Sequence, residues 1–145
     1  MNRSDKALKL YSQGLNCAQS VIASFADILE LDEDKAIRIA SGFGGGMGGM
    51  QGTCGAATGA YMVIGYLRGR VINGTEVSND ETNALVQEFS KRFAQKHQST
   101  NCKALISFDL NTEKGKKEAE KADVFNTKCT LFVTTAVEIL DEILN

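Results

Sequence analysis

Apolar residues recur at spacings of three and four positions along most of the chain, which is the pattern of an amphipathic helix. One stripe runs through Val21, Phe25 and Ile28, and another runs through Phe89 and Phe93. The long segments lack the alternation that is typical of strands, and the chain contains no proline. The pattern predicts an all-α fold in which these stripes face a common core.

Helix start and stop signals divide this pattern into a bundle of about six or seven helices, in one domain over residues 1–145. Residues 71–77 are expected to form a loop with an Asn73-Gly74 turn, and the charged residues 112–123 a solvated helix or a connector. The predicted helices start at capping residues. The first runs from Ser4-Asp5 to about Gln13, the second starts at Asn16, which forms a capping box with Gln19, and the third runs from Asp32 through Ala40. The others run from Thr53 to Arg68–Arg70, from Ser78 to near His97, from Thr100 or Asn101, and from Asn126 or Thr127 through Leu140.

Seven of the eleven residues from Gly42 to Gly52 are glycine, which predicts a loop directly before the central helix. Its apolar residues Phe43, Met47 and Met50 are unusual for a flexible linker. Residues 44–49 formally match the dinucleotide-binding pattern G-x-G-x-x-G. A helix precedes the loop and no βαβ unit surrounds it, so we reject a dinucleotide site.

Composition and charge exclude several classes of partner. A net charge of −2 does not provide the excess positive charge that binding to nucleic acid or to an anionic membrane surface requires. No apolar run approaches the roughly 20 residues that a membrane span needs, and the first residues lack the pattern of a signal peptide. We therefore expect a cytoplasmic protein without membrane insertion.

The four cysteines, Cys17, Cys54, Cys102 and Cys129, are each predicted to lie in the first turn of a helix. A helix N-terminus favours a nearby anion, and the thiolate is the reactive form of cysteine. Cytosolic disulfides are rare and are mostly catalytic or redox-sensing. The chain has no Cys-x-x-Cys pair, which disfavours a structural zinc site. The placement therefore favours redox chemistry of the thiols.

Each of these features also has a plain structural interpretation. A buried free cysteine often behaves as a small hydrophobic residue. The one histidine, His97, is expected to be exposed at a helix C-terminus without a catalytic role. Thr58 and Tyr61 lie within two turns of Cys54 and could donate to a thiolate, although packing in the core is the simpler interpretation.

The residues 16–19, 41–48 and 52–59 resemble the C_GCAxxG_C_C family of redox-active proteins. The central signature of the family, Cys-Gly-Ala-x-x-Gly, corresponds to Cys54 through Gly59, and two further single cysteines correspond to Cys102 and Cys129. The resemblance implies redox activity of the cysteines without a defined reaction, together with an association with transporter systems. Similar members of the family occur beside or fused to electron-transfer modules, which keeps an iron–sulfur role open.

These observations support three hypotheses. In the first, four helix N-termini converge under the glycine-rich loop, and Cys54 attacks a disulfide as a thiolate with a lowered pKa. Cys17, Cys102 or Cys129 would then resolve the mixed disulfide. In the second, the thiolates of all four cysteines hold an iron–sulfur cluster or another soft metal. In the third, the thiols are buried and inert. Under the first two, the candidate binding glycines are Gly44, Gly45, Gly46 and Gly55.

The expected partner is a redox protein or a small thiol that exchanges electrons with the cysteines. Gly55 and Gly59 lie four positions apart, so their shared helix face permits close approach of another backbone. That backbone could belong to a helix of a second subunit, which would make the protein a homodimer.

Overall fold

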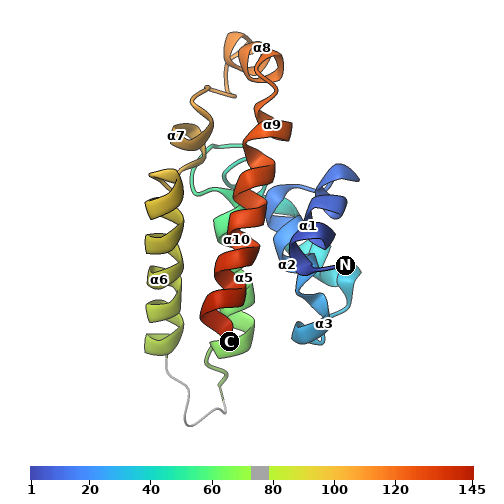
Figure 1. Cartoon of the computed structure of the whole chain (residues 1–145), viewed down its shortest axis with the longest axis vertical. Helices are drawn as coiled ribbons and strands as arrows, with labels where there is room; N and C mark the ends of the chain where they lie inside the picture. The colour runs from blue at the N-terminus through green and yellow to red at the C-terminus, as the bar shows by residue number, and fades with distance from the viewer. Residues whose placement is uncertain (73–78) are drawn as a thin grey trace.

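The computed structural model describes residues 1–72 and 79–145, and the chain is built from helices (Figure 1). Over these residues the one β-type pairing is an isolated bridge between Thr53 and Asn101. The predicted all-α fold is therefore confirmed. The predicted Asn73-Gly74 turn and the predicted cap at Ser78 lie outside the described residues.

The described residues form more helical segments than the six or seven predicted, because one helix expected to be continuous is interrupted and a short helix precedes the last one. Phe25 ends one helix and begins the next, and Lys128 separates a short helix from the last one. The glycine-rich segment likewise starts with a 3-10 turn instead of being a loop throughout. The segments are α1 (Arg3–Ser12), α2 (Cys17–Ser24), α3 (Ala26–Leu29), α4 (Glu33–Ala40), η1 (Ser41–Phe43), α5 (Gly55–Arg68), α6 (Asn79–His97), α7 (Cys102–Ile106), α8 (Glu113–Lys121), α9 (Val124–Thr127) and α10 (Cys129–Leu144).

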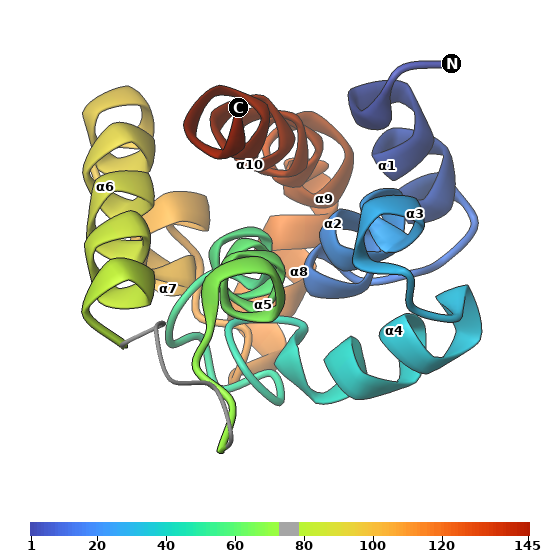
Figure 2. The same cartoon turned by 90° about the horizontal axis from the view of Figure 1, so that it is seen from below.

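Helix α5 lies in the middle of the molecule, and it contacts α2, α6 and α10 (Figure 2). Helix α1 packs against both α2 and α10, and α4 packs against the other side of α2. The short helices α7, α8 and α9 lie together at the end of the molecule where α10 begins (Figure 1). None of the described helices combines the length and the apolar character that crossing a membrane requires.

Two glycines explain why α2 lies so close to α5. A Cβ atom on Gly59 would lie 2.8 Å from the carbonyl oxygen of Ala18, and one on Gly55 would lie 3.0 Å from the backbone nitrogen of Ala18. The backbone that approaches this small-residue face is therefore α2 of the same chain. The helix of a second subunit that we expected on this face is excluded from it, and a homodimer remains a prediction without this basis.

The buried residues form one connected cluster that follows the predicted stripes in part. Val21, Phe25, Phe89 and Phe93 are buried as predicted. Ile28 was predicted to continue the first stripe, but its side chain is 42% exposed. The stripe is lost because the interruption at Phe25 changes the direction of the chain, so Ile28 belongs to α3 and not to the face of α2.

His97 is not the exposed surface residue that we predicted. Its ring packs against Phe93 and Phe132, and its Nε2 atom lies 2.9 Å from the hydroxyl oxygen of Thr135. Burial, and to a smaller extent the charge of Lys96, lowers the pKa of His97. The imidazole fills the contact between the end of α6 and α10, a long-range contact that is not visible in the sequence.

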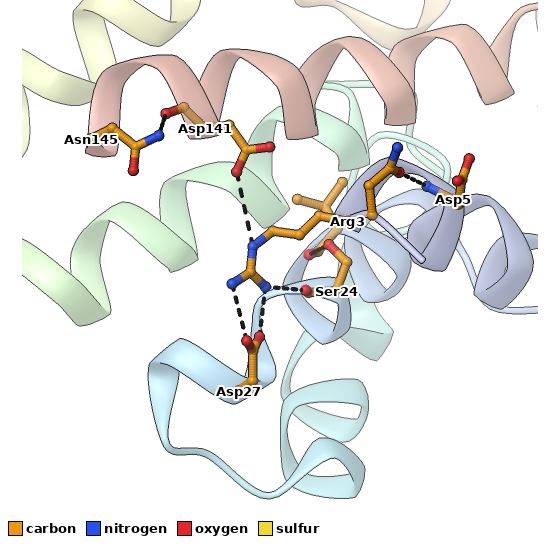
Figure 3. A network of polar contacts seen from close by, with 8 residues as sticks. Arg3, Asp5, Ser24, Asp27, Asp141 and Asn145 are labelled. Carbon is orange, nitrogen blue, oxygen red and sulfur yellow. Dashed lines mark hydrogen bonds and ion pairs between the residues drawn. The ribbon is translucent and has the colours of Figure 1, made fainter.

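Arg3 holds the start of α1 against three other helices, α2, α3 and α10 (Figure 3). Its guanidinium donates to both carboxylate oxygens of Asp27, at 2.6 and 3.0 Å, and to the carbonyl oxygen of Ser24 at 2.7 Å. The same group lies over the ring of Phe25 and 3.9 Å from a carboxylate oxygen of Asp141. These contacts tie α1 to α2, α3 and α10, and so fix the helix that carries Tyr11.

Candidate functional site

All four cysteines line one pocket, with a volume of about 320 Å³. Cys17, Cys102 and Cys129 are the first residues of α2, α7 and α10, and Cys54 is the residue directly before α5. All four are free thiols in the structure. Residues that are far apart in the sequence are thus brought together at four helix starts. Their chemical roles remain predictions.

Two of these helix starts are built as the sequence predicted. The Asn16 side chain accepts a hydrogen bond from the Gln19 N–H at 2.8 Å, and the Gln19 side chain accepts one from the Asn16 N–H at 3.0 Å. The Asn101 side chain accepts from the Ala104 N–H at 3.0 Å. These caps end the preceding loops and place Cys17 and Cys102 at the first helical positions.

The start of α5 differs from the prediction. Thr53 was expected to cap the helix, but it pairs with Asn101 in the isolated bridge, and Cys54 itself occupies the capping position. The Cys54 N–H donates to the carbonyl oxygen of Thr100 at 2.7 Å. The bridge therefore joins the start of α5 to the start of α7 and holds two of the cysteines in one region.

The start of α10 also lacks the expected cap. Asn126 and Thr127 belong to the preceding short helix α9, and Lys128 separates that helix from α10 without a side-chain capping bond. Cys129 nevertheless lies in the first turn of α10, as predicted, and is its first residue. Because α9 packs on α10, the turn between them directs Cys129 into the pocket.

The glycine-rich loop is tied to itself and to α7, which excludes a flexible linker. The Gln51 N–H donates to the Gly45 carbonyl at 2.9 Å, and the Gly52 N–H donates to the Gly46 carbonyl at 2.8 Å. The Cys102 N–H in turn donates to the Gly52 carbonyl at 2.7 Å. The loop thereby forms one wall of the pocket beside Cys102.

Three of the four candidate binding glycines, Gly45, Gly46 and Gly55, line the pocket. Gly44 does not, because it packs against the side chain of Asn16, where a Cβ atom would lie 2.7 Å from Nδ2. The backbone of Gly44 therefore supports the cap of α2, and the structure gives no basis for a direct role in binding. Binding by the other three remains a prediction.

The predicted low pKa of Cys54 is wrong. Burial raises the pKa of Cys54 to about 12, although the N–H groups of Ala56 and Ala57 at the start of α5 act in the opposite direction. The nearby sulfurs of Cys102 and Cys129 raise this pKa further. The helix N-terminus does act to lower the pKa of Cys54, as expected, but the loss of water around the buried sulfur is the larger effect and raises it.

Cys129 is the thiol that the pocket makes more acidic. The neighbouring Cys17 thiol is the main influence that lowers the pKa of Cys129, burial opposes it, and the Tyr11 hydroxyl and the charge of Lys128 lower the pKa further. The same contact raises the pKa of Cys17 well above its ordinary value, because Cys17 is then the donor and keeps its proton. The two thiols therefore form a pair in which Cys129 ionises first.

Cys102 stays protonated at neutral pH, with a polar neighbour that the sequence did not indicate. Burial raises the pKa of Cys102 to about 11, and a hydrogen bond with the buried Gln51 partly opposes this effect. The Gln51 side chain also accepts from the Leu110 N–H and donates to the Phe108 carbonyl, both at 2.7 Å. Gln51 thus connects the glycine-rich loop to the segment after α7.

Tyr11 is a site residue that sequence reasoning missed. Its hydroxyl donates to the Phe125 carbonyl at 2.8 Å and also interacts with Cys129. Burial is the main cause that raises the pKa of Tyr11, so the hydroxyl keeps its proton. The one signal in the sequence was the spacing of four between Ala7 and Tyr11, which places both on the inner face of α1.

The hydroxyl groups of Thr58 and Tyr61 have other partners than a thiol. Thr58 donates to the carbonyl oxygen of Gly55 at 3.2 Å, and Tyr61 pairs with the hydroxyl of Ser90 in α6. The interpretation of both as packing residues therefore agrees with the structure.

Replacing Tyr11 with phenylalanine should raise the pKa of Cys129. The rate of its reaction with an alkylating reagent increases with pH up to that pKa and is then constant, so the inflection should move to higher pH. At pH 7 we expect a loss of roughly tenfold. The single Tyr11 O–H can turn from the Phe125 carbonyl to the ionised sulfur, and a hydrogen bond to a charged acceptor contributes about 1.5–3 kcal/mol, less the bond that is given up. Tyr61→Phe is the matched control, and an unchanged inflection in Tyr11→Phe would exclude this role.

The described side chains do not fit a metal centre. An iron–sulfur cluster or a structural zinc ion takes several cysteine or histidine donors around one point. Within residues 1–72 and 79–145, no three Cys, His, Asp or Glu side chains are arranged so that they could hold a metal ion. The arrangement of Cys17, Cys54, Cys102 and Cys129 therefore gives no support to the cluster hypothesis.

Comparison with known proteins gives one match. No curated protein and no solved structure matches the chain. The profile of one family matches residues 15–143, which covers all four cysteines and the glycine-rich loop. That match spans most of the sequence, and it agrees with the resemblance carried by residues 54–59. The chain belongs to the family described as "Putative redox-active protein (C_GCAxxG_C_C)".

Proposed function

We propose that the protein performs thiol–disulfide exchange, with Cys129 as the attacking thiolate and Cys17 as the resolving thiol. The observation that carries the proposal is that the starts of α2 and α10 bring Cys17 and Cys129 into one pocket beside Tyr11. Their proximity lowers the pKa of Cys129 and so favours its thiolate. A lowered pKa and an adjacent second thiol are the features that exchange requires. The membership in a redox-active family supports the same chemistry.

The reaction takes place in two substitutions at sulfur. The Cys129 thiolate attacks a substrate disulfide, forms a mixed disulfide and releases the first substrate thiolate, which takes up a proton. The Cys17 thiol then loses its proton and attacks the Cys129 sulfur, which releases the second substrate thiol. Two protein thiols and one disulfide thus become one protein disulfide and two small thiols, and two electrons pass to the substrate.

Cys54 and Cys102 have a different part in this proposal. Burial raises the pKa of both thiols, so they remain protonated while Cys129 reacts. They lie in the same pocket, so in a later exchange they can reduce the Cys17–Cys129 disulfide and become oxidised in its place. A redox partner protein or a small thiol in the cytoplasm then regenerates the reduced state.

The test is the stoichiometry of the reaction under anaerobic conditions. Fully reduced protein is mixed with one equivalent of bis(2-hydroxyethyl) disulfide, and free thiols are counted on the desalted protein. We expect the loss of two protein thiols for each disulfide consumed. A protein that keeps all four thiols would contradict the proposal.

A parallel sample distinguishes exchange from cluster binding. The reduced protein is incubated with ferrous iron and sulfide, desalted anaerobically and measured for visible absorption, iron and sulfide. We expect no retained iron or sulfide. Retention of both in a fixed ratio to protein, lost when any one cysteine is replaced, would support the cluster hypothesis instead.

A further inference from the structure

The wall of the thiol pocket is apolar. Among the described residues that line it, none is Asp, Glu, Lys, Arg or His. Its polar groups are the thiols, the Tyr11 hydroxyl, the Asn16 side chain and the backbone of four glycines. Aliphatic and aromatic side chains form the remainder, namely Leu15, Leu105, Ile106, Leu110, Phe125 and Phe132.

This wall disfavours substrates with a charge of either sign. A charged group that enters an apolar pocket loses its water, and an opposite charge must compensate for this loss. Apart from the reacting thiolate of Cys129, the lining of this pocket supplies no such charge. A neutral substituent loses little on entry and gains contact with the leucine and phenylalanine side chains.

The size of the pocket and the depth of the sulfurs favour a small molecule. A volume of about 320 Å³ is at the lower end of the range for ligand sites. The attacking residue Cys129 is 8% exposed, and Cys54 is 5% exposed. A disulfide held between two protein chains cannot bring its sulfur to Cys129 without opening the pocket.

We propose that the substrate is a small, neutral organic disulfide with apolar or uncharged substituents. It enters past Leu15, Leu110 and Phe125, which are the apolar lining residues that are half-buried or exposed, whereas Leu105, Ile106 and Phe132 are buried. This inference rests on the proposed exchange function and specifies its substrate class. The two protein thiols supply the electrons, and the products are two neutral small thiols and the Cys17–Cys129 disulfide.

The experiment compares disulfides of similar size and different charge. Reduced protein is mixed with neutral bis(2-hydroxyethyl) disulfide, dianionic 3,3′-dithiodipropionate, dicationic cystamine, and insulin as a protein disulfide. The rate of thiol loss with each is divided by the rate for dithiothreitol with the same compound, which removes intrinsic reactivity. We expect the neutral disulfide to exceed the other three at least tenfold after this division.

The outcomes separate the inference from the function. If a charged disulfide or insulin reacts as fast as the neutral one after normalisation, the substrate class is wrong while exchange stands. If none of the four compounds removes thiols from the protein, the exchange function itself fails. Both outcomes are measured on the native protein, so neither depends on whether a variant folds.

A variant pair tests whether the pocket wall determines this selectivity. Phe125 lines the pocket and is 37% exposed, so Phe125→Arg adds a positive charge at the wall that can reach water, while the aliphatic part of arginine keeps part of the buried contact. We expect it to raise the relative rate of the dianionic disulfide at least fivefold and to lower that of cystamine. Leu131→Arg is the control, because Leu131 is 57% exposed and does not line the pocket. Equal shifts in both variants would overturn the assignment of the entrance.

Discussion

Replacing Cys129 with serine should lower the rate of disulfide exchange at least ~100-fold, because a serine hydroxyl does not ionise at neutral pH as a thiol does. Cys129 is the thiol whose pKa falls below its ordinary value in this pocket. The Cys17→Ser variant should still attack, but it lacks the resolving thiol. The measurement is thiol release from bis(2-hydroxyethyl) disulfide, with the intact mass of the protein recorded at each time.

The two remaining cysteines provide matched controls for this prediction. Cys54→Ser and Cys102→Ser should keep the first exchange within about threefold of the native rate, because both thiols are protonated at neutral pH. The Cys17→Ser variant should accumulate a mixed disulfide on Cys129, seen as a mass increase of half the substrate. Loss of exchange in Cys54→Ser alone would return the attacking role to Cys54.

Replacing Gly46 with alanine should destabilise the protein by about 2–5 kcal/mol, from left-handed strain and steric overlap together. Gly46 has a φ of +70°, and a Cβ atom there would lie 2.6 Å from the Cα of Gln51 and 2.7 Å from the Cβ of Cys102. The wall beside Cys102 would have to move. The free energy of unfolding is measured by urea denaturation of the reduced protein.

Gly49→Ala is the matched control for this substitution. Gly49 has a similar φ of +74°, but a Cβ atom there would meet nothing within 4 Å. The free energy of unfolding of Gly49→Ala should therefore fall only by the cost of left-handed strain, about 1–2 kcal/mol. Equal losses in the two variants would mean that the close approach of the loop to Gln51 and Cys102 does not contribute to stability.

Local signals in the sequence were sufficient for several parts of the site. The capping side chains Asn16 and Asn101 act within three residues, so their effect could be inferred without the fold. They correctly placed Cys17 and Cys102 at helix starts. The density of glycine between residues 42 and 52 likewise predicted a constrained segment before α5.

Features that depend on distant contacts could not be predicted. The interruption of the helix at Phe25 exposes Ile28, although the apolar spacing continues through both residues. Tyr11 reaches Phe125 and Cys129 only because α1 packs on α10. No local pattern of residues encodes that contact.

The prediction of a low pKa for Cys54 failed for a related reason. A helix N-terminus lowers the pKa of a thiol wherever it occurs, so Cys54 and Cys129 looked alike in sequence. Burial raises the pKa of Cys54, whereas contacts with Cys17 and Tyr11 lower the pKa of Cys129. Loss of water and side-chain partners depend on the tertiary structure, and here they outweigh the local effect.

Mapping the first disulfide that forms tests the account most directly. Reduced protein receives one equivalent of a small neutral disulfide, the remaining thiols are alkylated, and the linked peptides are identified by mass spectrometry. We predict a linkage between Cys17 and Cys129 within one chain. A first linkage between Cys54 and Cys102, or one that joins two chains, would contradict the adjacency on which the proposed exchange depends.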